Sequence, residues 1–269
     1  MAYSGIDVSK WQGNIDWKKV KAAGVQFALL RAGYGDTLNN PSQLDSTFVP
    51  NYNGCKSNGI PVGVYWYSYA TTTAMAVQEA KSCIAALKGK QFEYPIYYDV
   101  EEMRIFNTGK TNEIIKAFAD EMEKAGYWVG IYIYLSAANA WLNDDTKKRY
   151  AMAIAQYADK CTYTYPYGVW QNSSTWRVNG INGNVDHDYC YVDYPSQIKA
   201  KGKNGFPAPT PAPTTLKYKV TKDTPIVVFE GTATTGKTYE VKGRKTVCGV
   251  QYGRITDKGY ISLKDAKQV

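Results

Sequence analysis

The sequence predicts an α/β protein with two parts: an irregular closed barrel of the (β/α)5(β)3 kind and a small all-β module after it. Eight segments rich in β-branched and aromatic residues recur up to residue 191, and helical patterns follow the first five of them. Little helix is predicted after the last three, so the barrel should become irregular at its end. Beyond residue 215, short strand-like segments are separated by Gly and Thr turns.

The predicted barrel strands include several near-continuous apolar or aromatic runs, as expected where helices cover the outside of a sheet. They span residues 5–9, 27–35, 61–70, 94–101, 128–134, 150–157, 168–174 and 184–191. Among the helices, 16–24 starts at an Asp cap and ends in Gly, and 73–89 and 111–126 carry apolar residues at helical spacing up to a Gly. Two shorter helices are expected near 44–58 and 136–143.

The composition changes after the last barrel strand. Residues 199–215 alternate Pro with small residues, which favours a semi-rigid linker between a barrel domain (1–198) and a C-terminal module (216–269). The module has eleven Lys or Arg and five Asp or Glu, so it carries +6 of the chain's net charge of +8. This charge predicts an anionic partner. Without a recognition helix, an RNP-like motif or a dense basic stripe, an anionic cell wall fits better than nucleic acid.

Two further features concern location. No apolar run approaches the roughly 18 residues needed to cross a bilayer, so no membrane partner is expected. The first residues, MAYSGIDVSKWQG, have neither a basic n-region nor an apolar h-region, so we expect a protein without a signal peptide that is held in the cytoplasm until it is released. The odd number and wide spacing of the five cysteines favour reduced thiols.

The single histidine, His187, excludes several kinds of chemistry. Zinc sites need several closely spaced His or Cys ligands, and Ser-His-Asp or Cys-His catalysis needs a well-placed imidazole. We therefore expect neither a metal nor a cofactor. Of the kinds of catalysis considered, the one that the sequence still allows is catalysis by carboxyl groups.

The segment YPIYYDVEE carries the candidate chemistry at the end of a buried strand. Residues i and i+2 of a strand share a face, so Asp99 and Glu101 should project together into the mouth of the barrel, where active sites of such barrels lie. One carboxyl group kept protonated and one kept ionised is what glycoside hydrolysis needs. The alternative is that these acids only cap the following helix.

Residues from other strands are expected to join this pair. Asp7 closes GID at the C-terminal end of the first strand and Asp186 lies near the end of the last, and these strands are neighbours in a closed barrel. Arg31 either balances the acids by contacting substrate or forms an ion pair inside the barrel. Three aromatic residues at strand ends either line a sugar cleft or pack in the core: Tyr65, Tyr132 and Trp170.

Several motifs in one order carry a resemblance to a known family. They are GIDVSKWQG (5–13), LLRAGYG (29–35), Asp45 with FVPNY (48–52), GIPVGVYWYSYA (59–70), PIYYDVE (95–101), VGIYIY (129–134), IAQY (154–157), VWQ (169–171) and GNVDHD (183–188). Over residues 3–195 the chain resembles the lysozymes of glycoside hydrolase family 25, the Chalaropsis type. The resemblance implies an irregular barrel of eight strands and five helices. It also implies cleavage of the β-1,4 bond between N-acetylmuramic acid and N-acetylglucosamine in peptidoglycan.

The same resemblance assigns roles to the acids. It implies that Glu101 is the general acid and that Asp99 supports the substrate N-acetyl group in a neighbouring-group mechanism with retention. Asp7 and Asp186 would complete the acidic cluster. This chain has Asp188 where the family often has Asn, so Asp188 is given no role. His187, between two inward acids, should point outward.

The C-terminal module resembles a bacterial SH3-type wall-binding domain in its length, its strand rhythm and its GYISL ending. A muramidase barrel, a Pro-rich linker and such a module are typical of a phage endolysin that binds the Gram-positive wall through both domains after holin-dependent release from the cytoplasm. Three alternatives stay open: a chitinase-like glycosidase, a peptidoglycan-binding protein without activity, and a bacterial autolysin. The oligomeric state is not predicted.

Overall fold

The computed structural model describes residues 2–208 without a break and, beyond them, residues 216–220, 224–225, 232–233, 236–247, 250–255 and 259–268. The chain divides into two compact units, Met1–Pro209 and Thr210–Val269. No helix of the described residues is long and apolar enough to cross a membrane.

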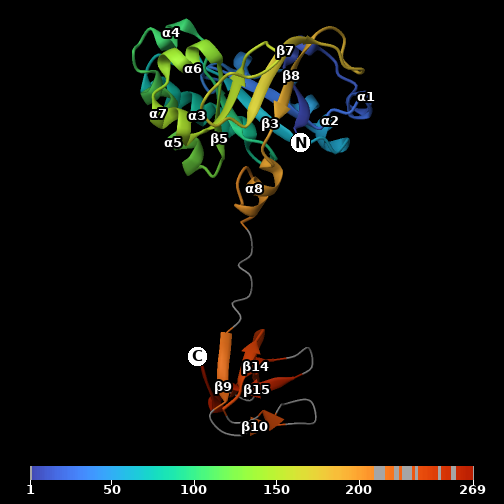
Figure 1. The fold of residues 1–269 in the computed structure, drawn as a ribbon, viewed down its shortest axis with the longest axis vertical. Helices are drawn as coiled ribbons and strands as arrows, with labels where there is room; N and C mark the ends of the chain where they lie inside the picture. Colours follow the sequence, from blue (N-terminus) through green and yellow to red (C-terminus); the bar gives the residue numbers. More distant parts are fainter. Residues whose placement is uncertain are drawn as a thin grey trace. The chain divides into compact units, whose positions relative to one another are not determined.

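Eight strands of the first unit close into a barrel in chain order (Figure 1). They are β1 (Tyr3–Val8), β2 (Phe27–Tyr34), β3 (Val62–Tyr67), β4 (Ile96–Asp99), β5 (Val129–Tyr134), β6 (Ala151–Ala155), β7 (Val169–Trp176) and β8 (Val185–Cys190). Strands β1 to β7 are parallel, whereas β8 runs antiparallel to both of its neighbours, β7 and β1. All eight strands coincide with predicted segments, and the barrel is closed as expected.

Helices follow each of the first five strands, and one more follows β8. They are α1 (Trp17–Ala22), α2 (Phe48–Ser57), α3 (Thr73–Leu87), α4 (Met103–Phe106), α5 (Thr111–Lys124), α6 (Leu135–Trp141), α7 (Asp144–Arg149) and α8 (Tyr194–Ala200), with 3-10 turns η1 (Lys10–Gln12) and η2 (Pro41–Gln43). No helix lies between β6 and β7 or between β7 and β8, where every residue is described. The five expected helices are confirmed. Helices α4, α7 and α8, of four to seven residues, were not predicted.

Strand alternation separates two cores. Outward side chains such as Tyr98, which stacks on Phe118 of α5 with ring centroids 3.8 Å apart, form the large layer between barrel and helices. Inward side chains near the N-terminal ends of the strands form a second cluster, in which Phe27 stacks on Tyr94. Gly5 faces this ring so closely that an added Cβ would overlap Phe27. The barrel interior is thus filled at one end, and its other end can hold a site.

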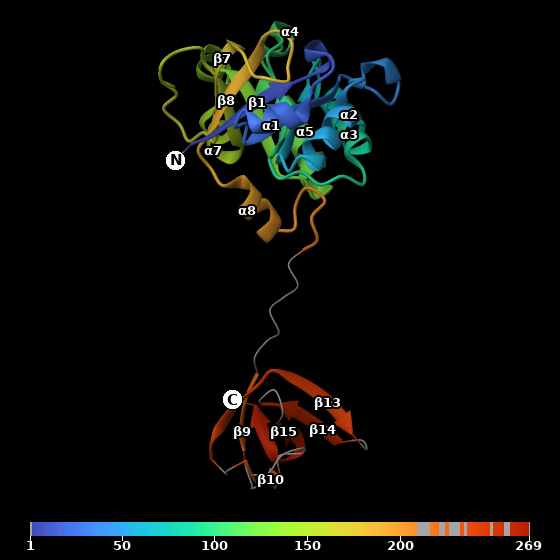
Figure 2. The same ribbon diagram turned by 90° about the vertical axis from the view of Figure 1, so that its right-hand side faces the viewer.

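Helix α8 and the residues after it lie against the filled end of the barrel (Figure 2). The side-chain amide of Asn204 donates to the Tyr94 carbonyl (2.8 Å) and accepts from the Trp128 amide (2.7 Å), and Asn204 is fully buried. Phe206 packs on the same cluster. Residues 199–206 therefore belong to the barrel unit, which corrects the predicted linker start at residue 199. The segment is rich in Lys and Gly, so its composition does not indicate that one of its side chains, Asn204, is buried in the barrel unit.

The described residues of the second unit are all β apart from one 3-10 turn, η3 (Leu263–Asp265). Two three-stranded antiparallel sheets form, in the orders β12-β9-β16 and β13-β14-β15, beside a two-stranded pair, β10-β11. Their strands are β9 (Leu216–Val220), β10 (Thr224–Pro225), β11 (Thr232–Ala233), β12 (Thr238–Val241), β13 (Gly243–Val247), β14 (Val250–Arg254), β15 (Tyr260–Ser262) and β16 (Ala266–Gln268). Val241 and Ile261 form the centre of its described core.

The cysteines of the described residues carry free thiols, as expected. Cys55, Cys83 and Cys190 are buried in the barrel unit, and Cys161 is half-buried. Cys248 lies outside the described residues. Burial raises the pKa of the Cys190 thiol to about 12, so this group stays protonated and packs as a small apolar side chain.

Candidate active site

A cavity of about 330 Å³ opens at the end of the barrel where the parallel strands terminate. Four acids line it, as the sequence predicted: Asp7, Asp99, Glu101 and Asp186. The remaining lining residues are Ser9, Trp11, Gln12, Leu29, Arg31, Tyr65, Tyr67, Tyr97, Tyr132, Tyr157 and Gln171. Of these described residues, Arg31 is the only cation, so the cavity is strongly acidic.

Strand β4 presents the first two acids. Asp99 is the last residue of the strand and only 4% exposed, while Glu101 lies two residues later and is half-buried. Between them, Val100 is buried in the layer under the helices. The alternation that the sequence predicted therefore brings both carboxyl groups to one cavity. One carboxylate oxygen of Asp99, Oδ1, is buried without a hydrogen-bond partner in the protein, which is unusual for so polar an atom.

Burial raises the pKa of both carboxyl groups. The pKa of Asp99 lies well above its usual value because of burial and then because of the charge of Glu101, with Arg31 opposing the shift. The pKa of Glu101 is raised by burial, against a hydrogen-bonding contact from Tyr67. Two interacting carboxyl groups release their protons as a pair, so this pair retains one proton to a higher pH than exposed acids do.

Asp186 reaches the same cavity because the last strand runs antiparallel to the others. Asp186 lies near the start of β8, and the sequence placed it near the strand's end. Because β8 is antiparallel, its start lies at the rim where the other strands end, and Asp186 pairs directly with Asp7 of β1. Burial raises the pKa of both residues, and for Asp7 the charges of Asp188 and Asp186 raise it further.

Asp188 lies below Asp186 on the same face of β8. It is 1% exposed, its Oδ2 has no hydrogen-bond partner, and it does not line the cavity. Burial and the charge of Asp186 raise the pKa of Asp188 to about 8. A carboxyl group in this position is protonated at neutral pH. It then resembles the side-chain amide of Asn in shape and neutrality.

Gln171 of β7 connects the acids to the aromatic wall, and the sequence analysis gave it no role. Its side-chain amide donates to Oδ2 of Asp7 (2.6 Å). Its Oε1 accepts hydrogen bonds from the hydroxyl groups of Tyr132 (2.9 Å) and Tyr157 (3.1 Å). The side chain is 3% exposed, so these contacts fix the orientation of Asp7 within the cavity.

Arg31 forms an ion pair, one of the two alternatives considered for it, and it also lines the cavity. Its Nε donates to Oδ2 of Asp45 (2.8 Å), an ion pair at the edge of the barrel, and its guanidinium lines the cavity. Its terminal NH2 group is buried without a partner in the protein. One side of the guanidinium is thus held by Asp45, while the other faces the acidic cavity.

Two of the three predicted aromatic residues, Tyr65 and Tyr132, line the cavity, whereas Trp170 does not. The indole of Trp170 donates to the Gln156 carbonyl (2.8 Å), outside the barrel interior. Since Gln171 points inward, its neighbour Trp170 must point outward. Tyr157, 59% exposed, lines the cavity from the segment after β6, where no strand alternation could indicate its direction.

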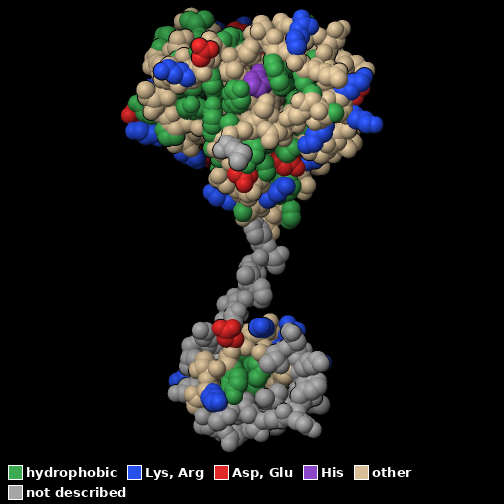
Figure 3. Space-filling model, turned by 45° about the vertical axis from the view of Figure 1, so that its right-hand side comes forward, with side chains coloured by type: hydrophobic (Ala, Val, Ile, Leu, Met, Phe, Trp, Pro, Cys, Tyr) green, Lys and Arg blue, Asp and Glu red, His purple; other side chains and the backbone are tan. Residues whose placement is uncertain are grey.

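His187 points out of the barrel, as alternation predicted. It is 7% exposed, it contacts Ser4 Oγ (2.8 Å) and Asn172 Oδ1 (2.7 Å), and its ring packs on those of Trp176 and Tyr189. Figure 3 shows the only histidine of the chain on a face where hydrophobic side chains surround it. Burial lowers the pKa of His187, so the ring is neutral and forms part of the packing of the uncovered strands.

The arrangement suits acid-assisted cleavage of a glycosidic bond. Glu101 is the more exposed member of the pair and can reach a leaving oxygen, while the deeper Asp99 can face positive charge that develops at a sugar carbon. Tyrosine rings and hydroxyl groups on the walls suit the mixed apolar and polar faces of a sugar.

Comparisons with known proteins agree with this chemistry. The family model described as glycosyl hydrolases family 25 matches residues 6–181. The autolytic lysozyme of Clostridium acetobutylicum is 30% identical over 185 residues, covering 68% of this chain and 54% of its own length. The N,O-diacetylmuramidase of Chalaropsis is 25% identical over 210 residues, covering 68% of this chain and 95% of that protein.

A solved structure shows the same fold. The modular autolysin LytC of Streptococcus pneumoniae superposes with a TM-score of 0.63 at 32% identity, covering 71% of this chain and 47% of that one. This chain thus spans about half the length of these two autolytic relatives. Since the family match covers the barrel from β1 into the connection between β7 and β8, the chain belongs to family 25 of the glycosyl hydrolases.

Proposed function

We propose that this chain is a Chalaropsis-type lysozyme that hydrolyses the β-1,4 bond between N-acetylmuramic acid and N-acetylglucosamine in bacterial peptidoglycan. The observation that carries the proposal is the pair Asp99 and Glu101 on one wall of an acidic cavity, where burial raises the pKa of both. The family of the barrel and its lysozyme relatives support the choice of substrate.

In the proposed mechanism, Glu101 donates its proton to the glycosidic oxygen as the C1–O bond breaks. The acetamido oxygen of the muramic acid attacks C1 from the other face and forms an oxazolinium ion, and Asp99 stabilises the positive charge on it. Water, deprotonated by Glu101, then opens this ring and restores the original configuration at C1. Asp7, held by Gln171, and Asp186, paired with it in register, complete the acidic lining of the cavity.

The second unit is proposed to be an SH3-type wall-binding domain. The support is its small all-β architecture and its net charge of +6 over residues 216–269. If this proposal holds, a chain that ends at Ala208 keeps its activity on soluble wall fragments but binds whole Gram-positive cells more weakly. A cut at residue 198 would also remove Asn204 from the barrel, so residue 208 is the better place to truncate.

We further propose that the protein is a phage or prophage endolysin, held in the cytoplasm until a holin opens the membrane. The domain order supports this proposal, and a bacterial autolysin is the alternative. Expression with and without a holin, with lysis followed over time, distinguishes the two: an endolysin lyses cells only when the holin is present.

The test of the reaction is the chemical nature of the new reducing end. Purified Gram-positive walls are digested, reduced with borohydride and hydrolysed, and the sugar alcohols are identified. A muramidase gives muramitol. Glucosaminitol alone would contradict the proposed bond specificity, and faster release from chitin than from walls would indicate a chitinase-like enzyme. Wall binding without release of any reducing end would leave only a binding protein.

A further inference from the structure

An exposed tryptophan stands at the rim of the catalytic cavity. Trp11 lies in the 3-10 turn η1, is 77% exposed, and lines the cavity that holds the four acids. No other large hydrophobic side chain of the described residues is exposed to a greater extent. A tryptophan ring exposed to water does not gain the free energy that burial of its large apolar surface provides. Because Trp11 lies beside the cavity, we expect a bound ligand to cover its ring.

The turn that carries Trp11 is held rigidly. Ser9 caps it: the Ser9 amide donates to Gln12 Oε1 (2.9 Å), and the Trp11 amide donates to Ser9 Oγ (3.3 Å). The Lys10 amide donates to Oδ2 of Asp45 (3.0 Å). The indole is therefore presented from a fixed backbone, which lowers the entropy that binding would otherwise cost.

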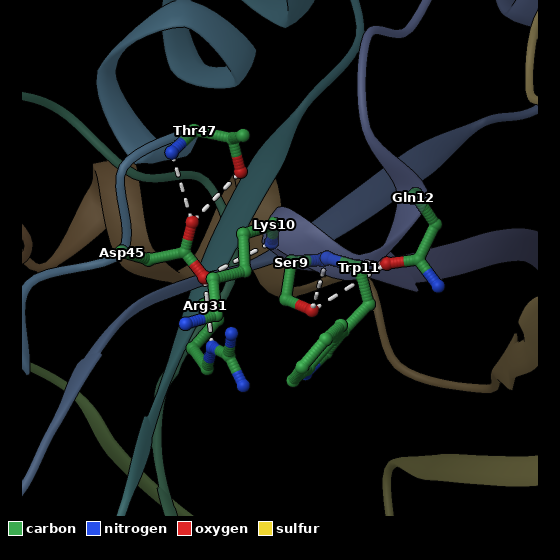
Figure 4. Close-up of polar contacts among 7 residues, drawn as sticks. All are labelled: Ser9, Lys10, Trp11, Gln12, Arg31, Asp45 and Thr47. Carbon is green, nitrogen blue, oxygen red and sulfur yellow. Dashed lines mark hydrogen bonds and ion pairs between the residues drawn. The ribbon is translucent and has the colours of Figure 1, made fainter.

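Asp45 connects this turn to the cavity wall. The same oxygen that accepts from the Lys10 amide also accepts from Nε of Arg31 (2.8 Å), while Oδ1 accepts from the amide and hydroxyl of Thr47. Figure 4 shows the Trp11 indole and the Arg31 guanidinium extending in the same direction from this network. Both line the cavity, so Asp45 sets the position of an aromatic surface and a cation at one edge of it.

A second cation accompanies the indole. The ammonium group of Lys10 lies 5.2 Å from the centre of the Trp11 ring, and no carboxylate of the described residues pairs with it. Four acids line the cavity, whereas the edge formed by Trp11 also has Arg31, and Lys10 lies next to this edge, beside the Trp11 ring. An anionic group of a ligand would be repelled from the acids and attracted to this edge.

We propose that Lys10 and Trp11 form a substrate subsite in which the indole stacks on the face of an N-acetyl amino sugar and the ammonium group binds an acidic substituent of the muramyl unit. This inference rests on the proposed function for the identity of the sugar. The stem peptide of peptidoglycan supplies carboxylates, and the lactyl group supplies one in a muramyl unit that carries no peptide, whereas chitin has none. The subsite therefore contributes to selection of wall glycan over neutral glycan, and Asp45 positions it.

The test separates stacking from charge with two ligands. Binding of a soluble muramyl glycan and of neutral chitotetraose is measured by calorimetry in full-length Glu101→Gln protein, and KM and kcat are measured without that substitution. Trp11→Ala should weaken binding of both ligands about tenfold and raise KM while kcat changes little. Trp11→Phe, which keeps a smaller stacking surface, should restore part of the affinity.

Lys10→Gln should weaken binding of the muramyl glycan about threefold, leave chitotetraose unchanged, and reduce the dependence of muramyl glycan binding on salt. Lys18→Gln and Leu38→Ala, exposed positions outside the cavity, are the matched controls and should behave as wild type. Thermal unfolding of each variant checks that the fold is intact.

The outcomes separate the two proposals. A wild-type enzyme that cleaves walls, with unchanged KM in Trp11→Ala and equal effects of Lys10→Gln on both ligands, would overturn the subsite alone. A wild-type protein that releases no reducing ends would overturn the proposed function. In that case, weaker glycan binding by the Trp11 and Lys10 variants would still support the subsite.

Discussion

The cavity holds acids on two walls that face each other across the barrel. The two walls differ in the hydrogen-bond partners that they give to the carboxyl groups. On β4, Asp99 is buried with one oxygen unpartnered, and Glu101 beside it is half-exposed. On the wall of β1, β7 and β8, Asp7 is fixed by Gln171 and paired in register with Asp186. The carboxyl groups of the β4 pair can therefore interact with a ligand, whereas the orientation of Asp7 is held by contacts within the protein.

The difference indicates how the work is divided. An acid that gives and takes a proton during the reaction must reach the substrate, and a carboxylate that opposes a developing positive charge needs an unoccupied oxygen. The β4 wall meets both conditions. The opposite wall needs its acids close together, which is tolerated only because protons and the Gln171 amide reduce their repulsion.

Glu101→Gln tests the β4 wall and should have the largest effect. Removing the proton donor is expected to lower kcat on wall fragments by about 10²–10⁴-fold, with little change in stability, since Glu101 is half-exposed. Glu102→Gln is the matched control. Glu102 contacts Tyr67 and Arg104 and does not line the cavity, so this variant should keep most of its activity. Equal losses in both variants would argue against Glu101 as the acid.

Gln171→Met tests the opposite wall and should have an intermediate effect. The substitution keeps length and volume but removes the donor to Asp7 and the acceptor for two tyrosine hydroxyls. We expect kcat/KM to fall about tenfold, because a lost hydrogen bond to a charged group is worth about 1.5–3 kcal/mol. Loss of the Gln171 bond also raises the pKa of Asp7, so the activity of the variant should decline at a different pH. An unchanged pH–rate profile would show that Asp7 does not depend on Gln171.

Asp188→Asn should have the smallest effect on activity and a clear effect on stability. The pKa of Asp188 is raised to about 8 in the fold, whereas an unfolded Asp titrates near 3.9. Between these values the folded state holds a proton that the unfolded state has released, so Asp188 costs stability that increases as pH rises from about 4 to 8. Asn removes this cost. The melting temperature of the variant should exceed that of wild type by more at pH 8 than at pH 4, and a difference that does not depend on pH would contradict the raised pKa.

The sequence predicted the barrel well because its signals are local. All eight strands and the five longer helical patterns follow from residue type and periodicity, and the alternation of Asp99, Val100 and Glu101 placed both acids in one cavity. The direction of β8 could not be predicted, because strand direction depends on the connection and not on the strand. Asp186 was therefore assigned to the wrong end of its strand, although it reaches the correct rim.

The residues that sequence reasoning missed depend on contacts between distant segments. Choosing between Trp170 and Gln171 requires knowing which face of β7 is inward, and this follows only from its register with β8. Tyr157 and Trp11 lie in segments outside the barrel strands, where no periodicity predicts direction. Asn204 anchors the end of the barrel unit through contacts with residues more than 70 positions away in sequence, within a stretch whose composition resembles a linker.

The most direct test of the roles assigned to the two β4 acids uses a synthetic substrate in which dinitrophenolate is the leaving group from an N-acetylmuramic acid residue. Such a leaving group departs without protonation, so in the first turnover, before Glu101 is needed as a base, Glu101→Gln should release dinitrophenolate far better, relative to wild type, than it cleaves wall glycan. Asp99→Asn should remain impaired on both, because the positive charge at the sugar still needs its carboxylate. If Glu101→Gln loses both activities equally, or if Asp99→Asn recovers on the activated substrate, the roles assigned to the β4 acids are wrong.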